Sequence, residues 1–79
     1  MTEYRLIYKW GATHCKAITG DDNAQDIVKY INGNLAEMQD YLDLDEDAEF
    51  HIKKYTNGDC VSEWYGTPED LLGFMQEEA

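Results

Sequence analysis

The sequence predicts a two-layer α+β domain, a four-stranded antiparallel sheet with two helices on one face, in the order ββαββα. Three observations predict it. Apolar residues recur every three or four positions from Asn23 to Leu42, as on one face of a helix. Apolar and polar residues alternate before and after that segment, as in half-buried strands. Thr67-Pro68-Glu69-Asp70 then supplies a second helix start, with a Thr cap and a Pro at the first position.

Residues 4–10 are the first expected strand, and a two-residue Gly11-Ala12 turn is expected to return the chain through Thr13 to Thr19. In that register Tyr8 lies opposite Cys15, and Leu6 lies opposite Ala17. The face toward the helices carries Tyr4, Leu6, Tyr8 and Trp10. The open face is expected to carry Arg5, Lys9, His14 and Lys16.

The central helix has Asn23 as its expected N-cap. Asn32-Gly33-Asn34 is its weak point, because Gly33 is suited to a C-terminal stop and Asn34 to a new cap. The apolar stripe stays in phase across this point, so one kinked helix and two nearly collinear short helices both remain open. The stripe consists of Ala24, Ile27, Val28, Ile31, Leu35, Met38 and Leu42.

The second hairpin is expected to run from Glu49 to Tyr55 and from Cys60 to Tyr65. A two-residue Asn57-Gly58 turn places Cys60 on the face opposite Phe50, whereas a three-residue loop from Thr56 to Gly58 places it on the same face. A weak internal repeat favours the three-residue loop. Cys60, Ser62 and Trp64 then pack with Phe50 and Ile52, and the open face carries His51, Lys53, Tyr55, Val61, Glu63 and Tyr65.

The chain of 79 residues is interpreted as one domain, residues 1–79, because a chain this short has room for one core. The weak repeat relates residues 3–42 to residues 49–79, with Leu6 matching Ile52 and Ile31 matching Met75. Duplication, and convergence of two hairpin-then-helix units under one packing demand, both explain such a match.

The formal net charge of −11 is the most unusual feature of the composition. It argues against DNA, RNA or an anionic membrane as the partner, because Lys and Arg hold those polyanions, and it favours a basic protein surface. A solubility role for the charge is the alternative. The absence of a signal sequence and of a membrane-length apolar run, together with only two cysteines, predicts a cytoplasmic location.

No residue pattern supports a metal site, a cofactor or catalysis. His14 and Cys15 are adjacent in a strand and point to opposite faces, which opposes both a shared zinc ion and a Cys–His pair. The run from Asp43 to Asp47 resembles an EF-hand start but has Ala48 at the glycine position. We therefore predict a non-enzyme without metal or cofactor, with Cys15 and Cys60 as small buried core residues.

Acidic residues occupy six of the ten positions from Asp40 to Glu49. In size, acidity and lack of a catalytic pattern, the whole chain resembles the phage-encoded inhibitors of bacterial defence, the anti-CRISPR and antirestriction proteins, many of which resemble DNA in charge. The resemblance implies that acidic side chains occupy the basic nucleic-acid groove of a nuclease or effector complex in the host cytoplasm. The expected contact residues are Asp40, Asp43, Asp45, Glu46, Asp47 and Glu49, followed by Asp21, Asp22 and Asp26.

Two rival interpretations remain. A generic protein–protein interaction module uses exposed Tyr and Trp side chains as its binding residues. A nucleic-acid binder stacks bases on the aromatic and basic sheet face, which the net charge opposes.

Overall fold

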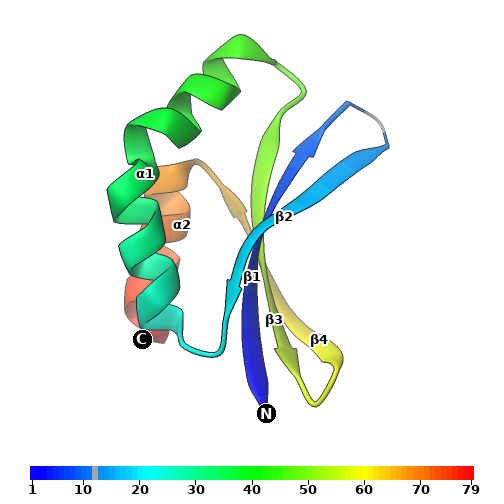
Figure 1. The fold of residues 1–79 in the computed structure, drawn as a ribbon, viewed down its shortest axis with the longest axis vertical. Coiled ribbons are helices and arrows are strands. Elements are labelled where there is room, and N and C mark those ends of the chain that lie inside the picture. Colours follow the sequence, from blue (N-terminus) through cyan, green and yellow to red (C-terminus); the bar gives the residue numbers. More distant parts are fainter. Residues whose placement is uncertain (12) are drawn as a thin grey trace.

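A computed structural model describes residues 1–11 and 13–79. The elements follow in the order β1 (Thr2–Trp10), β2 (His14–Asp21), α1 (Ala24–Leu44), β3 (Glu49–Thr56), β4 (Asp59–Gly66) and α2 (Pro68–Glu78). The strands form one antiparallel sheet in the order β2-β1-β3-β4. Both helices cover the same face of this sheet (Figure 1), so the predicted fold is confirmed.

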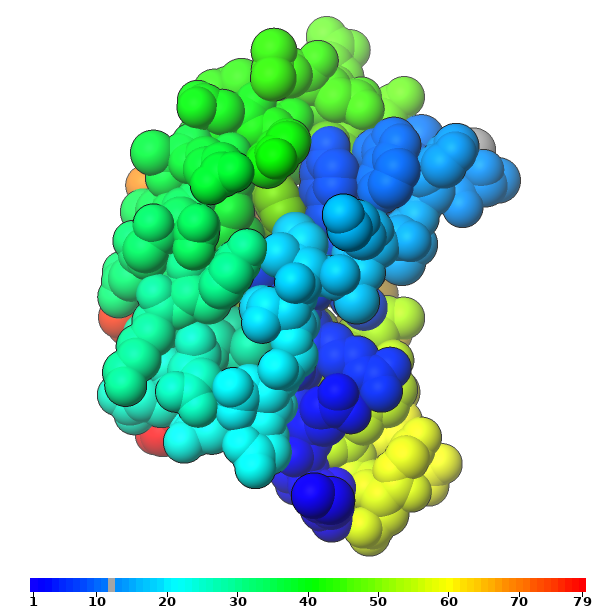
Figure 2. Space-filling view, viewed as in Figure 1, coloured from blue at the N-terminus to red at the C-terminus, as the bar shows by residue number. Residues whose placement is uncertain are grey.

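The two hairpins diverge from the middle of the sheet, and their tips lie at opposite ends of the molecule (Figure 1). The molecule measures 36 × 26 × 16 Å along its principal axes. In Figure 2 the β1/β2 hairpin, in blue, stands away from the body and faces the second half of α1, in green, across a hollow.

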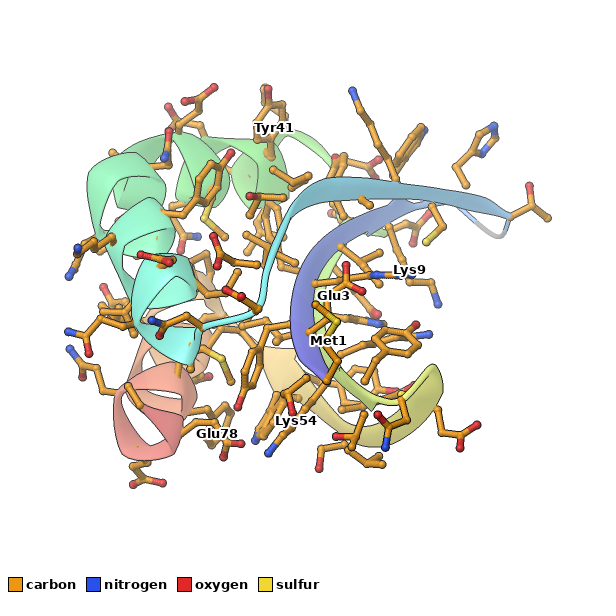
Figure 3. All side chains as sticks on the ribbon, turned by 60° about the horizontal axis from the view of Figure 1, so that its bottom comes forward. Met1, Glu3, Lys9, Tyr41, Lys54 and Glu78 are labelled. Carbon is orange, nitrogen blue, oxygen red and sulfur yellow. The ribbon has the colours of Figure 1, made fainter. Side chains whose placement is uncertain are left out.

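The face of the sheet away from the helices is open. Figure 3 shows Glu3 and Lys9 on that side, whereas Lys54 and Glu78 approach each other from β3 and α2. Ile7 of β1 pairs with His51 of β3, and both side chains point to the open face. Both are nevertheless buried. The Tyr65 ring lies against the His51 ring in a T-shaped arrangement with centroids 4.3 Å apart.

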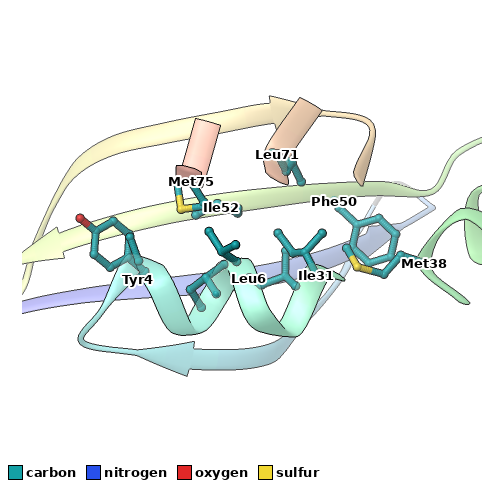
Figure 4. Packing of buried hydrophobic residues seen from close by; sticks show 11 residues of the cluster. Tyr4, Leu6, Ile31, Met38, Phe50, Ile52, Leu71 and Met75 are labelled. Atoms are coloured by element: carbon teal, nitrogen blue, oxygen red, sulfur yellow. The ribbon is translucent and has the colours of Figure 1, made fainter. Parts of the chain in front are cut away.

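The core lies between the sheet and the helices (Figure 4). Phe50 and Leu6 are its largest fully buried side chains. The predicted α1 stripe is confirmed: Ala24, Ile27, Val28, Ile31 and Met38 are buried, and Leu35 and Leu42 pack against the cluster. Leu71 and Met75 of α2, which covers the same face of the sheet, complete the core cluster.

Helix α1 is continuous but kinked at Asn34, whose φ of −128° and ψ of 15° are not helical. The Asn34 side-chain amide donates to the carbonyl of Tyr30 at 2.8 Å, which keeps that carbonyl bonded at the kink. Asn23 is the N-cap, as predicted, and accepts from the backbone N–H of Gln25 at 2.8 Å. Of the two arrangements left open, the structure therefore shows the kinked helix.

The predicted start of α2 is confirmed, and it is a full capping box. The Thr67 hydroxyl accepts from the backbone N–H of Asp70, and the Asp70 carboxylate accepts from that of Thr67, both at 3.2 Å. Gly66 precedes the cap with a φ of +144°, a conformation that L side chains rarely adopt.

Strands β1 and β3 form the centre of the sheet and place Leu6 directly opposite Ile52, its counterpart in the weak repeat. Each hairpin therefore lies on one side of the sheet centre, with its second strand at the edge. Duplication and convergence both still explain the similarity of the two units.

The predicted register of the first hairpin is wrong. Ala12, and with it the expected Gly11-Ala12 turn, lies outside the described residues, but β1 and β2 pair Trp10 with His14 and Lys9 with Cys15. Tyr8 therefore lies opposite Lys16, and Ile7 opposite Ala17. A shift of one residue moves each side chain to the other face, so His14 and Lys16 leave the open face and Cys15 joins it. A bulge between Leu6 and Ile7 then readjusts the pairing.

The second hairpin is closed by the two-residue turn that the repeat disfavoured. Thr56 pairs with Asp59, and Asn57 and Gly58 have φ values of 52° and 88°, as in a type I′ turn. Cys60 consequently lies opposite Tyr55, on the open face. An irregularity beside Tyr55 then reverses the faces again, so Trp64, which pairs with Ile52, lies on the face that was predicted for it.

Both cysteines are exposed, so the prediction that Cys15 and Cys60 are buried is wrong. The physical reason is the same at both sites. Loop length and a single bulge decide the face to which an edge-strand residue points, and residue type alone does not.

Candidate functional site

Five of the predicted contact residues lie together at the C-terminal end of α1 and in the turn that follows it. We call this group the acidic end; it consists of Asp40, Asp43, Asp45, Glu46 and Asp47. All but the half-buried Asp45 are exposed. Asp45 ends the helix in an extended conformation, and its carboxylate accepts from the backbone N–H of Asp47 at 3.0 Å. This local bond turns the chain toward β3 and holds the run as one surface.

The acidic end occupies an unfavourable position for negative charge. The C-terminus of a helix carries the negative end of the helix dipole, which cations stabilise and anions destabilise. The last turn of α1 contains no basic residue. None of the five carboxylates forms an ion pair within residues 1–11 and 13–79, although Lys9 borders a hollow with Glu46 and Asp47.

Glu49 stands apart from the acidic end. It begins β3, and its carboxylate lies 2.7 Å from the Nε2 of His51, whose side chain is buried. Glu49 is therefore engaged with the open face of the sheet, although its own side chain is largely exposed.

The other predicted acidic residues, Asp21, Asp22 and Asp26, lie at the far end of α1. The 21 residues of this helix span about 30 Å at 1.5 Å per residue. Asp26 lies in the first turn of α1, where negative charge is favourable. Asp21 and Asp22 border a separate hollow of about 590 Å³ beside Arg5 and Tyr55. The structure therefore does not bring the two predicted groups into one site.

The open sheet face carries the predicted cations Arg5, Lys9 and Lys53, of which two are paired. The Arg5 guanidinium binds both Glu3 carboxylate oxygens at 3.1 Å and lies 4.5 Å from the centre of the Tyr55 ring. The pKa of Arg5 is raised, first by the hydrogen bonds that it donates to Glu3 and then by the charge of that carboxylate. Lys53 lies 3.5 Å from Glu63. These pairs leave little free positive charge for a polyanion.

The hollow between α1 and the first hairpin is an aromatic groove of about 360 Å³ that the sequence analysis did not identify. Tyr8 is at its centre: the Tyr8 ring stacks on Trp10 with centroids 5.2 Å apart and packs against Tyr41 and Phe50 at 5.5 and 5.1 Å. The remaining lining comes from Lys16, Ile18, Tyr30, Asn34, Glu37 and Met38. Asn34, at the kink of α1, thus lies in the groove wall.

The groove adjoins the acidic end. Glu37 lines the groove, and Asp40 and Tyr41 follow three and four positions later, which makes them neighbours on the helix surface. The pKa of the Tyr8 hydroxyl is raised, mainly by burial and then by the negative charge of Asp45. Aromatic rings and carboxylates therefore share one continuous surface.

The position of Tyr41 in the sequence could have indicated the groove. This aromatic residue falls off the buried stripe of α1 and is 46% exposed. The placement of Tyr8 and Trp10 on the face toward the helices was correct, but these side chains are only half-buried. The tip of the first hairpin extends beyond the layer that the helices cover, so its aromatics line a groove.

Comparisons of the chain with protein-family models, with curated proteins and with solved structures gave no match. No helix in the described part of the chain is long and apolar enough to cross a membrane. Among residues 1–11 and 13–79, no three His, Cys, Asp or Glu side chains form a group that could hold a metal ion.

Proposed function

We propose that the protein is a non-enzymatic inhibitor that occupies the basic surface of a nucleic-acid-binding protein or nuclease complex, in the manner of phage-encoded anti-CRISPR and antirestriction proteins. Its place of action is the bacterial cytoplasm, and it requires no cofactor. The acidic end is its contact surface.

The observation that carries this proposal is the position of the acidic end. Its carboxylates are not ion-paired in the described part of the chain and lie at or beside the negative end of α1, where Asp43 in the last turn works against the helix dipole. Solubility would be served equally by acids at favourable positions, such as Asp26 in the first turn. Residues that break a local stability rule without a compensating contact indicate function.

The chemistry of the acidic end fits such a partner. Carboxylates displayed on a helix end and its turn can take the place of phosphates against Lys and Arg side chains. Together with the net charge of −11, they also attract a basic surface over long range and accelerate association. By contrast, Asp21, Asp22 and Asp26 lie at the other end of α1, a helix about 30 Å long, and form a separate acidic surface.

A displacement assay tests the proposal. Bacterial lysate is bound to immobilised double-stranded DNA, and the protein is added at constant salt. We expect it to release one or a few DNA-binding proteins, and we expect the quadruple variant Asp43→Asn, Asp45→Asn, Glu46→Gln, Asp47→Asn to release none. Equal release by the wild type and this variant would contradict the proposal.

A matched variant separates local from overall charge. Asp21→Asn, Asp22→Asn, Asp26→Asn and Glu77→Gln together change the net charge by the same amount, and all four residues lie outside the acidic end. If the acidic end is the contact surface, this variant keeps its displacing activity. If it loses activity to the same degree as the first, overall charge is responsible.

The aromatic groove supports a second candidate, the generic protein–protein interaction module. The observation in its favour is the half-exposed ring cluster of Tyr8, Trp10 and Tyr41, since Tyr and Trp dominate binding energy in protein interfaces. Salt separates the two candidates: contact through the acidic end weakens steeply as salt rises, and contact through aromatic rings changes little.

A further inference from the structure

The aromatic groove combines two properties that together define what it can bind. Its rings form a connected series in which Tyr8 contacts Trp10, Tyr41 and Phe50, and Trp10 in turn stacks on His14 at 5.2 Å. Its edge on the α1 side is acidic. Tyr41, which is 46% exposed, offers a ring face on which a flat group can stack, and the acidic edge selects a positively charged one.

The charges along the groove have a defined layout. Glu37 is exposed in the wall formed by α1, and Lys16 is exposed in the wall formed by β2. Neither forms an ion pair with any described residue. Lys16 and Glu37 thus face the groove from opposite walls without pairing, and the Asp40 and Asp45 carboxylates of the acidic end add to the negative charge on the α1 side.

We propose that this groove holds one arginine side chain of the basic protein partner, with the guanidinium stacked on the exposed Tyr41 ring, beside Tyr8 and Trp10, and its charge directed to Glu37. The proposal rests on the proposed function and names the residue that the partner inserts beside the acidic end. A guanidinium suits both features at once, because it is planar, stacks on aromatic faces and binds carboxylates in a forked geometry. A lysine ammonium offers only a strongly hydrated point charge.

Other occupants fit the groove less well. An apolar anchor would bring no charge to Glu37 and would not use the acidic edge of the groove. A nucleic-acid base would bring a phosphate toward Glu37, Asp40 and Asp45, in a molecule whose net charge is −11. The volume of about 360 Å³ is at the low end for ligand pockets, as suits one side chain.

Three capped tripeptides test this proposal: N-acetyl-Gly-Arg-Gly-amide and its lysine and norleucine analogues. The chain has two tryptophans, and the indole N–H signals in a two-dimensional nitrogen–proton NMR spectrum report on each separately. Trp10 lines the groove, whereas Trp64 lies on β4 opposite Ile52 and serves as an internal control. We expect the arginine peptide to shift the Trp10 signal to saturation and to leave the Trp64 signal in place.

The expected direction of the change in affinity differs among the peptides and between the two variants. The lysine peptide should bind about three- to fivefold more weakly than the arginine peptide, and the norleucine peptide should not bind. Glu37→Gln should weaken arginine binding about three- to fivefold, while Lys16→Gln should strengthen it. Both side chains are exposed, so neither change threatens the fold. Asp26→Asn, at the far end of α1, alters the net charge as Glu37→Gln does and should change the affinity less.

Three results would overturn the inference: equal binding of the arginine and norleucine peptides, equal shifts at Trp10 and Trp64, or no Trp10 shift at any peptide concentration. The assay is independent of DNA displacement. Arginine binding without displacement would remove the proposed function and leave the groove assignment, whereas displacement without arginine binding would remove only the groove assignment.

Discussion

The position of the acidic end predicts that neutralising it stabilises the fold. Asp43 lies in the last turn of α1, where a negative charge opposes the helix dipole at a cost of about 0.3–1 kcal/mol. Asp43→Asn keeps the side-chain oxygen that accepts from Gln39, so only the charge is lost. We therefore expect the free energy of unfolding to rise by about 0.3–1 kcal/mol. In a domain of this size each kcal/mol corresponds to about 4–8 °C in melting temperature.

Urea and thermal unfolding at low salt measure this change, and Asp26→Asn supplies the control. Asp26 lies in the first turn of the same helix, so its neutralisation removes a favourable dipole interaction and should lower stability by a similar amount. The two variants carry the same net charge. Opposite signs support the dipole argument, and the difference between the variants should shrink in high salt because the charges are exposed. If both variants gain stability equally, relief of overall repulsion explains the result and the reasoning from helix position is refuted.

Three further predictions concern the fold. Leu6→Ala removes a fully buried side chain and should cost about 2–5 kcal/mol in urea unfolding; a loss below 1 kcal/mol would contradict the described core. Gly66→Ala should lower the melting temperature, because φ is +144° there and an added Cβ would lie 2.9 Å from that of Asp70; an unchanged value would refute this. The Glu78 carboxylate accepts from Lys54 at 2.6 Å and Tyr4 at 2.9 Å, which lowers its pKa below the ordinary 4.5. The stabilisation that the ionised Glu78 carboxylate gives to the fold is therefore complete above pH 4.5, and it is lost as the pH falls through the lowered pKa of the folded state. The difference in unfolding free energy between the wild type and Glu78→Gln should therefore narrow from pH 7 to pH 3. A constant gap would exclude the ion pair as its source.

The acidic character of the candidate site was predictable from the sequence, but its geometry was only partly so. A run of acids between Asp40 and Asp47 is visible in the chain, and its place on the end of α1 follows from the periodicity of the helix. The separation from Asp21, Asp22 and Asp26 follows from helix length alone. The aromatic groove was not predictable, because it depends on where the first hairpin extends relative to the second half of α1.

The sequence by itself determined the type and order of the elements. Helix periodicity from Ala24 to Leu42, strand alternation in β1 and the capping box at Thr67 are local properties, and local backbone preferences and side-chain periodicity decide them. They also decided that one face of the sheet must be covered, since Leu6, Phe50 and Ile52 require burial.

Only the tertiary structure decided the strand order, the register of the edge strands and the groove. Pairing of β1 with β3 depends on contacts far apart in the chain, which no local pattern encodes. One residue more or less in a loop, or one bulge, reverses the face of every following side chain, and this placed Cys15 and Cys60 outside and Lys16 in the groove wall. The total energy of packing both layers selects among registers that the local sequence leaves nearly equal.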